Sequence, residues 1–450
     1  MDKRGNFSSG LGFVLAAAGS AVGLGNIWRF PYLAAKYGGG LFLLFYILLV
    51  LSFGYTLMIA ENAIGRKTGK SALSAFGELK KKWAFLGIIA TIIPAIILPY
   101  YNVIGGWVIK YAVTFITGSH EAAAQDGFFE GMLASPGQQL LFQFIFSAVT
   151  TFVILRGVQG GVERFSTILM PLLILLAIVV AIYSITLPGA FVGLKYMFVP
   201  DFSHFSVSAI LAALGQMFYS LSLAMGIMVA YGSYLPKDSD LEKNVGRIEI
   251  FDTGIALLAA LMIIPAVFAF SGGDESALGA GPGLMFITLP KVFSSMGMSR
   301  IIGSVFFVLV LLAAFTSSIS ILEAIVSSLC DKFGWDRTKT TVGAGIGSFL
   351  LGMPPILGYS LWQNVTLGGM SILDMMDFIT NSVLMPILAL LTCIFVAYVI
   401  GVSVIRDEVK LSSKFKREKM FNVMIKYIAP VLIIAILISS VLSALGIISL

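Results

Sequence analysis

Apolar residues run along this chain in long stretches, and short polar or basic segments separate one stretch from the next. A helical run of about 20 apolar residues crosses the hydrocarbon core of a bilayer. The pattern predicts an all-α membrane protein with eleven spans, at about 11–35, 40–65, 84–117, 138–156, 164–187, 208–235, 243–270, 300–330, 340–361, 374–402 and 420–447. No soluble domain interrupts them, so we expect residues 1–450 to form a single membrane transport domain.

The first span differs from an ordinary membrane helix at its centre, where Gly19, Gly23 and Gly25 lie close together. Each glycine lowers helix propensity by about 1 kcal/mol relative to alanine, so this centre can unwind easily. Unwound backbone is tolerated at mid-membrane only where it faces a cavity or binds something, and the polar residues Asn26 and Arg29 follow directly. We interpret the stretch as a substrate or ion site. A glycine-rich packing face for a neighbouring helix is the alternative.

A second interruption lies in the span at 208–235, around Gln216, Tyr219, Ser220 and Ser222. Spans one and six are therefore both interrupted, which is typical of an inverted-repeat transporter with its site between the broken helices. Half-helices that end at mid-membrane direct N–H groups toward anions and carbonyls toward cations. This geometry suits a zwitterion with a metal cation, and an amino acid with sodium meets both demands.

Composition and charge exclude some classes and set the orientation. The chain is 58% hydrophobic and its mean hydropathy is +0.96, which excludes a soluble globular protein. Its net charge of +6 comes from basic residues in short loops, so we expect no nucleic-acid partner. The positive-inside rule places the N-terminus in the cytoplasm, and an odd number of spans then places the C-terminus outside. We expect a multi-pass protein of a bacterial inner (plasma) membrane.

Three other functions compete with transport. A channel would show a continuous polar stripe or a repeated filter motif, whereas this chain has two local breaks. A membrane enzyme would need a nucleophile–base pair or a metal motif such as H-E-x-x-H. The two histidines, His120 and His204, fall in predicted loops, so we expect no enzyme activity and no organic cofactor. A non-transporting amino-acid sensor on the same fold stays open.

Three motifs resemble those of the neurotransmitter:sodium symporter family, in its bacterial, LeuT-like branch. They are Gly19-Ser-Ala-Val-Gly-Leu-Gly-Asn-Ile-Trp-Arg-Phe-Pro31, Phe218-Tyr-Ser-Leu-Ser222 and Thr316-Ser-Ser-Ile319. The resemblance covers essentially the full chain. It implies a sodium-coupled symporter that works by alternating access, with two inverted five-helix repeats and broken helices 1 and 6. The first repeat would be 1–187 and the second 208–402, with helix 11 at 420–447 outside both.

The resemblance assigns substrate contacts to the two breaks and to the spans beside them. A substrate carboxylate would bind the backbone N–H groups of Leu24 and Gly25 and the hydroxyl of Tyr101. The amine would meet the carbonyls of Ala21, Tyr219 and Ser220 and the hydroxyl of Ser222. The side-chain pocket would be lined by Ile97, Tyr101, Tyr219, Ala224, Met225, Ser317, Ser318 and Ile321. Because this lining is mostly apolar, the expected substrate is a hydrophobic or aromatic amino acid.

The resemblance also implies two sodium sites made of hard oxygen ligands, which suit a hard cation. The first would use the carbonyl of Ala21, the side chain of Asn26, the carbonyl and hydroxyl of Ser220, and Asp252, together with the substrate carboxylate. The second would use the carbonyls of Gly19, Val22 and Ala313 and the hydroxyls of Thr316 and Ser317.

Asp252 distinguishes this chain from chloride-dependent relatives, which have an asparagine at the matching position beside a bound chloride. Tyr46, Gln216 and Ser220 match the rest of that chloride shell. Since the carboxylate of Asp252 already supplies the negative charge, a second anion would be repelled, and we predict chloride-independent transport. Proton counter-transport through Asp252 is a further hypothesis.

Two ion pairs match the gates of the family: Arg29 with Asp377 on the outer side, and Arg4 with Asp331 on the cytoplasmic side. Exposed ion pairs contribute only about 0–1 kcal/mol each, which suits contacts that must open in every cycle. The glycine-rich segment 271–299 is too long for a tight turn, and we expect it to form a lid over the outer face.

Two residues depart from the family pattern near these gates. Ala224 stands where the second break usually has glycine, which should stiffen that break. Phe7 stands where an inner-gate tryptophan is common, so we expect a looser gate. The twelfth span of many relatives is absent from this sequence, and nothing in the pattern indicates an oligomeric state.

Overall fold

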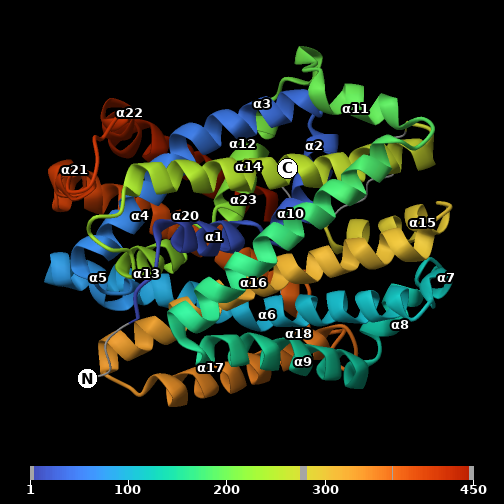
Figure 1. The fold of residues 1–450 in the computed structure, drawn as a ribbon, viewed down its shortest axis with the longest axis horizontal. Coiled ribbons are helices and arrows are strands. Elements are labelled where there is room, and N and C mark those ends of the chain that lie inside the picture. Colours follow the sequence, from blue (N-terminus) through green and yellow to red (C-terminus); the bar gives the residue numbers. More distant parts are fainter. Residues whose placement is uncertain (1–4, 274–280, 367, 445–450) are drawn as a thin grey trace.

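Helices form nearly all of the structure, a computed structural model that describes residues 5–273, 281–366 and 368–444. Within these ranges the only strand-like pairing is an isolated bridge between Gly39 and Pro200. Most long helices run close to the long axis of the molecule and form one bundle (Figure 1). The prediction of an all-α fold is confirmed.

The α-helices are α1 (Gly10–Ala21), α2 (Phe30–Lys36), α3 (Gly40–Leu49), α4 (Tyr55–Thr68), α5 (Ala72–Leu79), α6 (Phe85–Ile116), α7 (His120–Ala123), α8 (Phe128–Leu133), α9 (Pro136–Leu155), α10 (Arg164–Ile185), α11 (Ala190–Phe198), α12 (Val207–Ser220), α13 (Ile227–Ser233), α14 (Leu241–Ser271), α15 (Leu289–Ser294), α16 (Ser299–Phe333), α17 (Arg337–Leu351), α18 (Met353–Gly358), α19 (Ile372–Asp377), α20 (Met385–Ile394), α21 (Val402–Lys410), α22 (Glu418–Val423) and α23 (Ala429–Ala444). Wider π-helical turns are η1 (Gly25–Arg29), η2 (Val50–Gly54), η4 (Val158–Glu163), η7 (Leu284–Thr288), η8 (Phe378–Leu384), η9 (Phe395–Val399) and η10 (Met424–Ile428), and tighter 3₁₀ turns are η3 (Lys81–Trp83) and η5 (Phe202–His204).

The number of membrane crossings depends on how the broken helices are counted. In the described part of the chain, 9 helices are long and apolar enough to cross a membrane. A tenth span is the pair Gly10–Ala21 and Gly25–Lys36, which is bent by 55° at the first break. The predicted eleven is reached only by also counting α12 and α13 as one span, because each half of that second broken helix is short.

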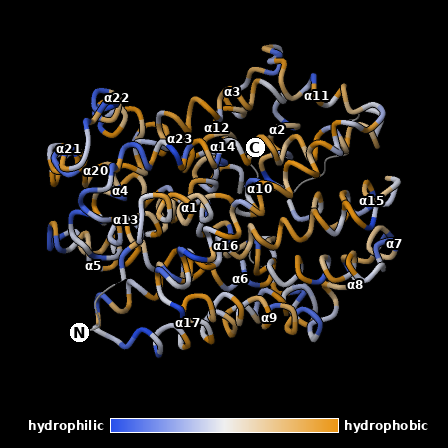
Figure 2. The backbone as a smooth tube through the Cα atoms, viewed as in Figure 1, coloured by the Kyte–Doolittle hydropathy of each residue, from blue (hydrophilic) through white to orange (hydrophobic). Residues whose placement is uncertain are grey.

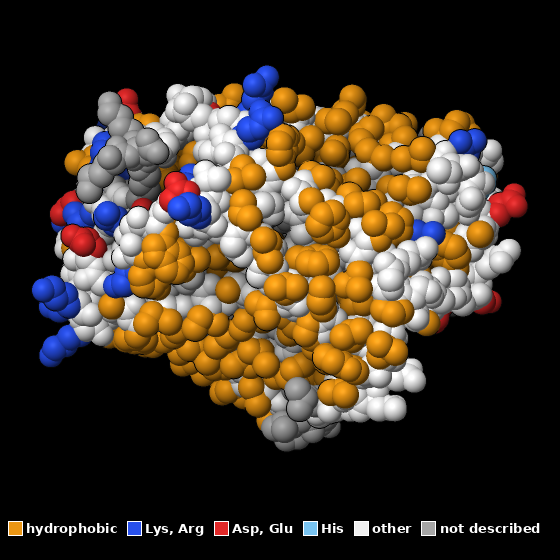
Figure 3. Space-filling model, turned by 90° about the horizontal axis from the view of Figure 1, so that it is seen from below, with side chains coloured by type: hydrophobic (Ala, Val, Ile, Leu, Met, Phe, Trp, Pro, Cys, Tyr) orange, Lys and Arg blue, Asp and Glu red, His pale blue; other side chains and the backbone are white. Residues whose placement is uncertain are grey.

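Polarity divides the surface as a membrane protein requires. Hydrophobic residues follow the lengths of the helices, and hydrophilic residues gather toward the two ends of the bundle (Figure 2). In the space-filling view, apolar side chains cover the middle of the visible face while charged side chains lie mainly near its two ends (Figure 3). The exposed apolar side chains along α9 and α10 therefore lie on the surface that would contact lipid.

The first broken span lies in the interior of the bundle. Its N-terminal half, α1, packs against α10, α14 and α16 (Figure 1). Ser9 begins α1, because its hydroxyl accepts a hydrogen bond from the N–H of Gly12 at 3.0 Å. Ser206 and Asp240 cap α12 and α14 in the same way.

The helices α4 and α13 approach each other backbone to backbone. A Cβ atom on Gly65 would overlap the carbonyl of Val229, and a Cβ on Gly232 would overlap the backbone of Asn62. Small residues permit such close packing. Inside a membrane, van der Waals contacts of this kind drive the association of helices in place of the hydrophobic effect. The C-terminal half of the second broken span, α13, is therefore held tightly to α4.

Part of the segment predicted as a lid, 274–280, lies outside the described residues. The following turn, η7, folds back onto the bundle, where the ring of Phe286 contacts the rings of Trp28, Trp107, Tyr111 and Phe129. The hydroxyl of Tyr111 also donates to the carbonyl of Phe286 at 2.7 Å. This aromatic cluster ties the segment to the C-terminal half of the first broken span, through Trp28.

The close approach of α4 and α13 generates a test of stability. Gly65→Ala should lower the free energy of unfolding by about 1–3 kcal/mol, because the added methyl group must displace backbone of α13. Gly254→Ala is the control, since Gly254 lies within α14 with no atom within 4 Å of an added Cβ. Thermal unfolding in detergent should show a lower Tm for the first variant only. Equal Tm values would contradict the close packing.

Candidate functional site

The first break separates α1 from η1 in the middle of the first span. Helix α1 ends at Ala21, and the chain turns through Val22 and Gly23 before η1 begins at Gly25. The N–H of Gly23 bonds to the carbonyl of Ala21 at 3.0 Å, and the N–H of Asn26 bonds to that of Gly23 at 3.2 Å. A Cβ at Gly25 would overlap the ring of Tyr219, so glycine permits the two breaks to touch.

The second break, between Ser220 and Ile227, is strained. Ser222 and Ala224 adopt positive φ angles of 52° and 54°, which for non-glycine residues costs about 1–2 kcal/mol each. The surroundings hold this conformation, because Ser222 donates to the carbonyl of Ser20 at 3.0 Å and the N–H of Ala224 donates to Glu61 at 2.8 Å. Alanine at 224 therefore makes this turn more strained than glycine would.

A cavity of about 30 Å³ lies between the two breaks, α6 and α16. Its walls are formed by Ser20, Ala21, Gly23, Leu24, Gly25, Asn26, Ile97, Tyr101, Tyr219, Ser222, Met225, Ser317 and Ile321. Ten of these are among the predicted substrate contacts, and Asn26 is a predicted sodium ligand. The hydroxyl of Tyr101 is buried without a hydrogen-bond partner in the described part of the chain. The structure therefore brings most of the predicted substrate site together.

Three predicted substrate contacts, Ser220, Ala224 and Ser318, do not line this cavity and instead hydrogen-bond to other parts of the protein. The hydroxyl of Ser220 bonds to Asp252, and the hydroxyl of Ser318 pairs with that of Thr150 at 2.7 Å. Ala224 is turned so that its N–H meets Glu61. These residues lie behind the lining, with their backbone or side chains supporting it.

Ser20 is a lining residue that the sequence analysis missed. Its hydroxyl donates to the hydroxyl of Ser222 at 3.0 Å, and its carbonyl accepts from Ser222 and Ser317 at 3.0 and 3.1 Å. It therefore joins both breaks to α16. The sequence feature that could have identified Ser20 is its position inside the glycine-rich break, where every carbonyl is a potential ligand.

Asp252, on α14, is completely buried and accepts hydrogen bonds from three other elements. Its Oδ1 accepts from Asn26 at 2.9 Å and from Ser220 at 2.5 Å, and its Oδ2 accepts from Tyr46 at 2.7 Å. Charge-assisted hydrogen bonds of this kind stabilise a buried carboxylate. Asn26 and Ser220 are predicted ligands of the first sodium site, and Tyr46 matches the chloride shell of relatives. The side chains of all three therefore donate to one acid. Gln216 instead donates to the carbonyl of Gly25 at 3.0 Å.

The residues of the predicted second sodium site lie where α1 ends against α16. The hydroxyl of Ser317 is 3.1 Å from the carbonyl of Ser20 and 3.4 Å from that of Gly19, and donates to both. The hydroxyl of Thr316 donates to the carbonyl of Ala313 at 3.0 Å. Val22, the remaining predicted ligand, is buried in the same break. Oxygen atoms of the two helices therefore gather at this point.

No group of three or more His, Cys, Asp or Glu side chains suited to a metal ion occurs in the described residues. A cation in this region would therefore be held by carbonyl, hydroxyl and amide oxygens with a single carboxylate. Such a donor set suits a hard monovalent cation better than a transition metal.

The predicted outer gate is not closed by a direct contact. No ion pair within 4.0 Å joins Arg29 and Asp377 in the part of the chain described, although both line a second cavity of about 60 Å³. The guanidinium of Arg29 lies over the ring of Tyr219, 5.6 Å from its centroid. Asp377 accepts instead from Asn381 at 2.6 Å and Tyr100 at 3.2 Å.

Of the predicted inner gate only Asp331 can be described, because Arg4 lies outside the described residues. Asp331 accepts from the N–H of Ser71 at 2.7 Å and from its hydroxyl at 2.5 Å. Nearby, Glu323 is fully buried, accepts from Tyr234 at 2.7 Å and pairs with Arg337 at 2.5 Å.

Phe7 is packed in this region rather than loose. Its ring makes edge contacts with Phe13, Tyr231 and Tyr234, and its N–H bonds to the carbonyl of Tyr234 at 3.1 Å. Phenylalanine therefore fills the space at the inner end of α1 through aromatic contacts.

The fold and the site define a class. Two broken helices that meet around a buried carboxylate and a cavity, inside a multi-pass helical bundle, are the architecture of a secondary membrane transporter. Comparison with known proteins identifies the family. Residues 4–123 and 131–447 match the Sodium:neurotransmitter symporter family. The chain therefore belongs to this family, and it is a sodium-dependent membrane transporter rather than an enzyme.

Individual relatives agree with this assignment. An uncharacterized sodium-dependent transporter of Bacillus subtilis (strain 168) is 36% identical over 450 residues, which cover 98% of each chain. A similar transporter of Haemophilus influenzae is 35% identical over 458 residues, covering 97% of this chain and 98% of the relative. The crystal structure of MhsT in complex with L-phenylalanine is 38% identical, with a TM-score of 0.87 over 97% of this chain and 100% of that one. The predicted LeuT-like fold is confirmed.

The contacts of Asp252 can be tested by removing one hydroxyl. Tyr46→Phe should lower the free energy of unfolding by about 1.5–3 kcal/mol, because a hydrogen bond to a charged group is lost from a buried site. Sodium-dependent thermal stabilisation should weaken in the same variant. Tyr183→Phe, which removes a part-buried hydroxyl with no hydrogen bond in the described structure, should change stability by less than about 0.5 kcal/mol. If the two variants are equally stable, Tyr46 does not support the acid.

Proposed function

We propose that this protein is a sodium-coupled symporter of a hydrophobic or aromatic amino acid. The observation that carries the proposal is the cavity between the two breaks, where apolar side chains lie opposite the non-helical backbone of the breaks. Ile97, Met225 and Ile321 supply an apolar wall, and the rings of Tyr101 and Tyr219 extend it. A charged substrate side chain would find no buried partner among these groups. MhsT, whose structure contains L-phenylalanine, supports this substrate class by similarity.

The polar end of the substrate is proposed to bind the breaks themselves. The N-terminal turn of η1, at Leu24 and Gly25, would hold the carboxylate together with the hydroxyl of Tyr101, which has no hydrogen-bond partner among the described residues. The amine would meet the carbonyl of Ala21, at the C-terminal end of α1, and that of Tyr219, near the C-terminal end of α12. Opposite helix ends thus receive opposite charges, which is the arrangement that a zwitterion requires.

Sodium is proposed to occupy two places beside the substrate. The first lies among the oxygens of Asn26, Ser220 and Asp252, which already converge. The second lies among the oxygens at the junction of α1 and α16. A substrate carboxylate at the first site would share the ion, so that each ligand would raise the affinity of the other.

Transport is proposed to be independent of chloride. The negative charge at the first sodium site is supplied by Asp252, and the hydroxyls that could bind an anion, those of Tyr46 and Ser220, are directed at its carboxylate. A chloride ion beside this carboxylate would be repelled strongly at low effective dielectric constant.

The substrate class is tested by a binding screen on purified protein. Each natural amino acid is added with sodium or with potassium, and the Tm is measured. A ligand at 100 times its Kd stabilises the folded state by about 2.7 kcal/mol. Aromatic and branched aliphatic amino acids should raise the Tm only in sodium. Stabilisation by charged or small polar amino acids alone would contradict the apolar site. Uptake into proteoliposomes with and without an inward sodium gradient then separates a transporter from a sensor.

The charge role of Asp252 is tested by replacing chloride with gluconate. Uptake by the wild-type protein should stay within about twofold, since its acid supplies the charge. Asp252→Asn should lose about tenfold or more in sodium affinity without chloride, and chloride should restore part of it through Tyr46 and Ser220. A wild-type protein that requires chloride would rule out this role for Asp252.

A further inference from the structure

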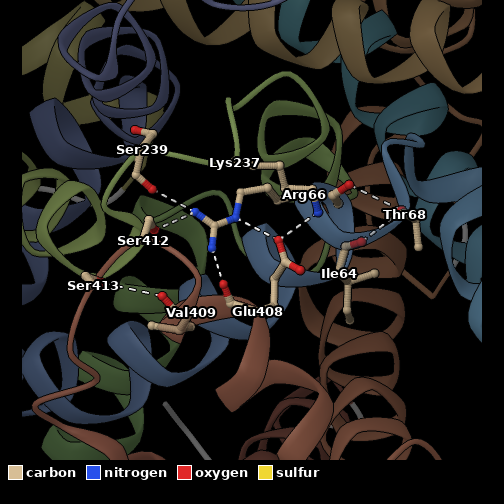
Figure 4. Close-up of polar contacts among 10 residues, drawn as sticks. Ile64, Arg66, Thr68, Lys237, Ser239, Glu408, Val409, Ser412 and Ser413 are labelled. Carbon is tan, nitrogen blue, oxygen red and sulfur yellow. Dashed lines mark hydrogen bonds and ion pairs between the residues drawn. The ribbon is translucent and has the colours of Figure 1, made fainter.

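A fully buried arginine joins three segments at the end of the bundle that carries α21. Arg66, near the C-terminal end of α4, has a side chain that is 0% exposed. Its Nε donates to the carboxylate of Glu408 at 2.9 Å, and its Nη2 donates to the carbonyl of the same residue (Figure 4). Its Nη1 donates to the carbonyl of Ser239 at 2.7 Å and to the hydroxyl of Ser412 at 3.2 Å. One planar guanidinium on α4 therefore satisfies acceptors in two separate parts of the chain, at Ser239 and at Glu408–Ser412.

These acceptors belong to segments that are far apart in sequence. Ser239 lies in the connection 234–240, which leads directly from α13, the C-terminal half of the second broken span, to α14. Glu408 lies on α21 and Ser412 follows it, in the connection between the last two spans. Lys237, also in 234–240, places its ammonium 2.9 Å from the Glu408 carboxylate. Arg66 from α4 and Lys237 from the connection therefore meet at one acid, Glu408.

A second acid fixes the other end of the same connection. Glu242, in the first turn of α14, accepts from the N–H groups of Lys416 and Arg417 at 2.7 and 3.0 Å. The hydroxyl of Tyr55, on α4, donates to the same carboxylate at 2.9 Å. Segment 402–417 is thus bound to α4 through Glu408 and Ser412, and to the start of α14 through the N–H groups of Lys416 and Arg417.

Because the side chains of Arg66 and Glu408 are buried, their ion pair resists separation when the protein changes conformation. A gate made of exposed ion pairs opens easily, because water replaces each partner. Separating Arg66 from Glu408 would instead leave the buried guanidinium without its acid, and Glu408 with only the exposed Lys237, which is strongly unfavourable. Helix α13 is in addition packed backbone to backbone on α4 at Gly65 and Gly232. The contact between these segments is therefore unsuited to breaking in every cycle.

We propose that Arg66 is a positioning residue that fixes α21 and the connection after α13 to α4, so that these elements move as one body when the transporter changes conformation. The C-terminal half of the second broken span would then carry α21 with it. The boundary that opens would lie on the other side of α13, where it faces α1 and α16. This inference goes beyond the proposed substrate and requires only that the protein alternates between conformations.

Hydrogen exchange of the purified protein tests the proposal without any substrate. Arg66→Lys keeps the charge but loses the planar fork, so amide exchange in 234–240 and in 402–410 should rise together, by about tenfold or more. Arg406→Lys is the matched control on α21, because Arg406 is partly exposed and pairs with its neighbour Asp407. It should change exchange by less than about twofold. Unchanged exchange in Arg66→Lys, or a rise in only one segment, would overturn the proposal.

Cross-linking tests whether the segments move together during transport. Asp238→Cys and Ser413→Cys flank two residues that contact the same nitrogen of Arg66, so a short bifunctional maleimide can bridge them in a protein whose Cys330 and Cys393 are replaced. If the segments form one body, bridging should leave sodium-driven uptake within about twofold of the unbridged protein. A loss of about tenfold or more on bridging, but not with a monofunctional maleimide, would overturn the proposal.

Discussion

The carboxylate of Asp252 must be stabilised by several donors at once, and those donors lie on three different spans. A charge at this depth in a membrane protein is unfavourable unless it is paired or hydrogen-bonded. Asn26 comes from the first break, Tyr46 from α3 and Ser220 from the end of α12. Satisfying the acid therefore brings both broken helices to one point. The cavity, its polar backbone and the proposed cation sites follow from that arrangement.

The two breaks reach this point in different ways. The first contains three glycines and unwinds with little strain, and the contact of Gly25 with Tyr219 requires the absence of a side chain. The second holds Ser222 and Ala224 at positive φ, so its conformation must be maintained by the hydrogen bonds that these residues donate to Ser20 and Glu61. Strain stored beside a binding site is a common feature of sites that change conformation. The second break is thus the more dependent on its surroundings.

Ion pairs in this protein fall into two groups with different physical roles. Arg29 and Asp377 line a small cavity without pairing directly, so they can approach or separate at little expense. Arg66 with Glu408, and Glu323 with Arg337, involve buried acids whose separation would strand a charge. The first kind suits a moving boundary, and the second kind suits a rigid one. Burial therefore distinguishes contacts that open from contacts that hold.

Membrane placement, the positions of the spans and both breaks were readable from local sequence, because apolar run length and glycine content act locally. The motif around Asn26 and the resemblance it carries also located most cavity residues, since one break supplies many of them. Tertiary structure decided that Ser220, Ala224 and Ser318 lie behind the cavity and that Ser20 lines it, because that depends on which partner satisfies each polar group. It likewise decided that Arg66 meets Glu408, 342 positions away, and no local pattern encodes such a distant pairing.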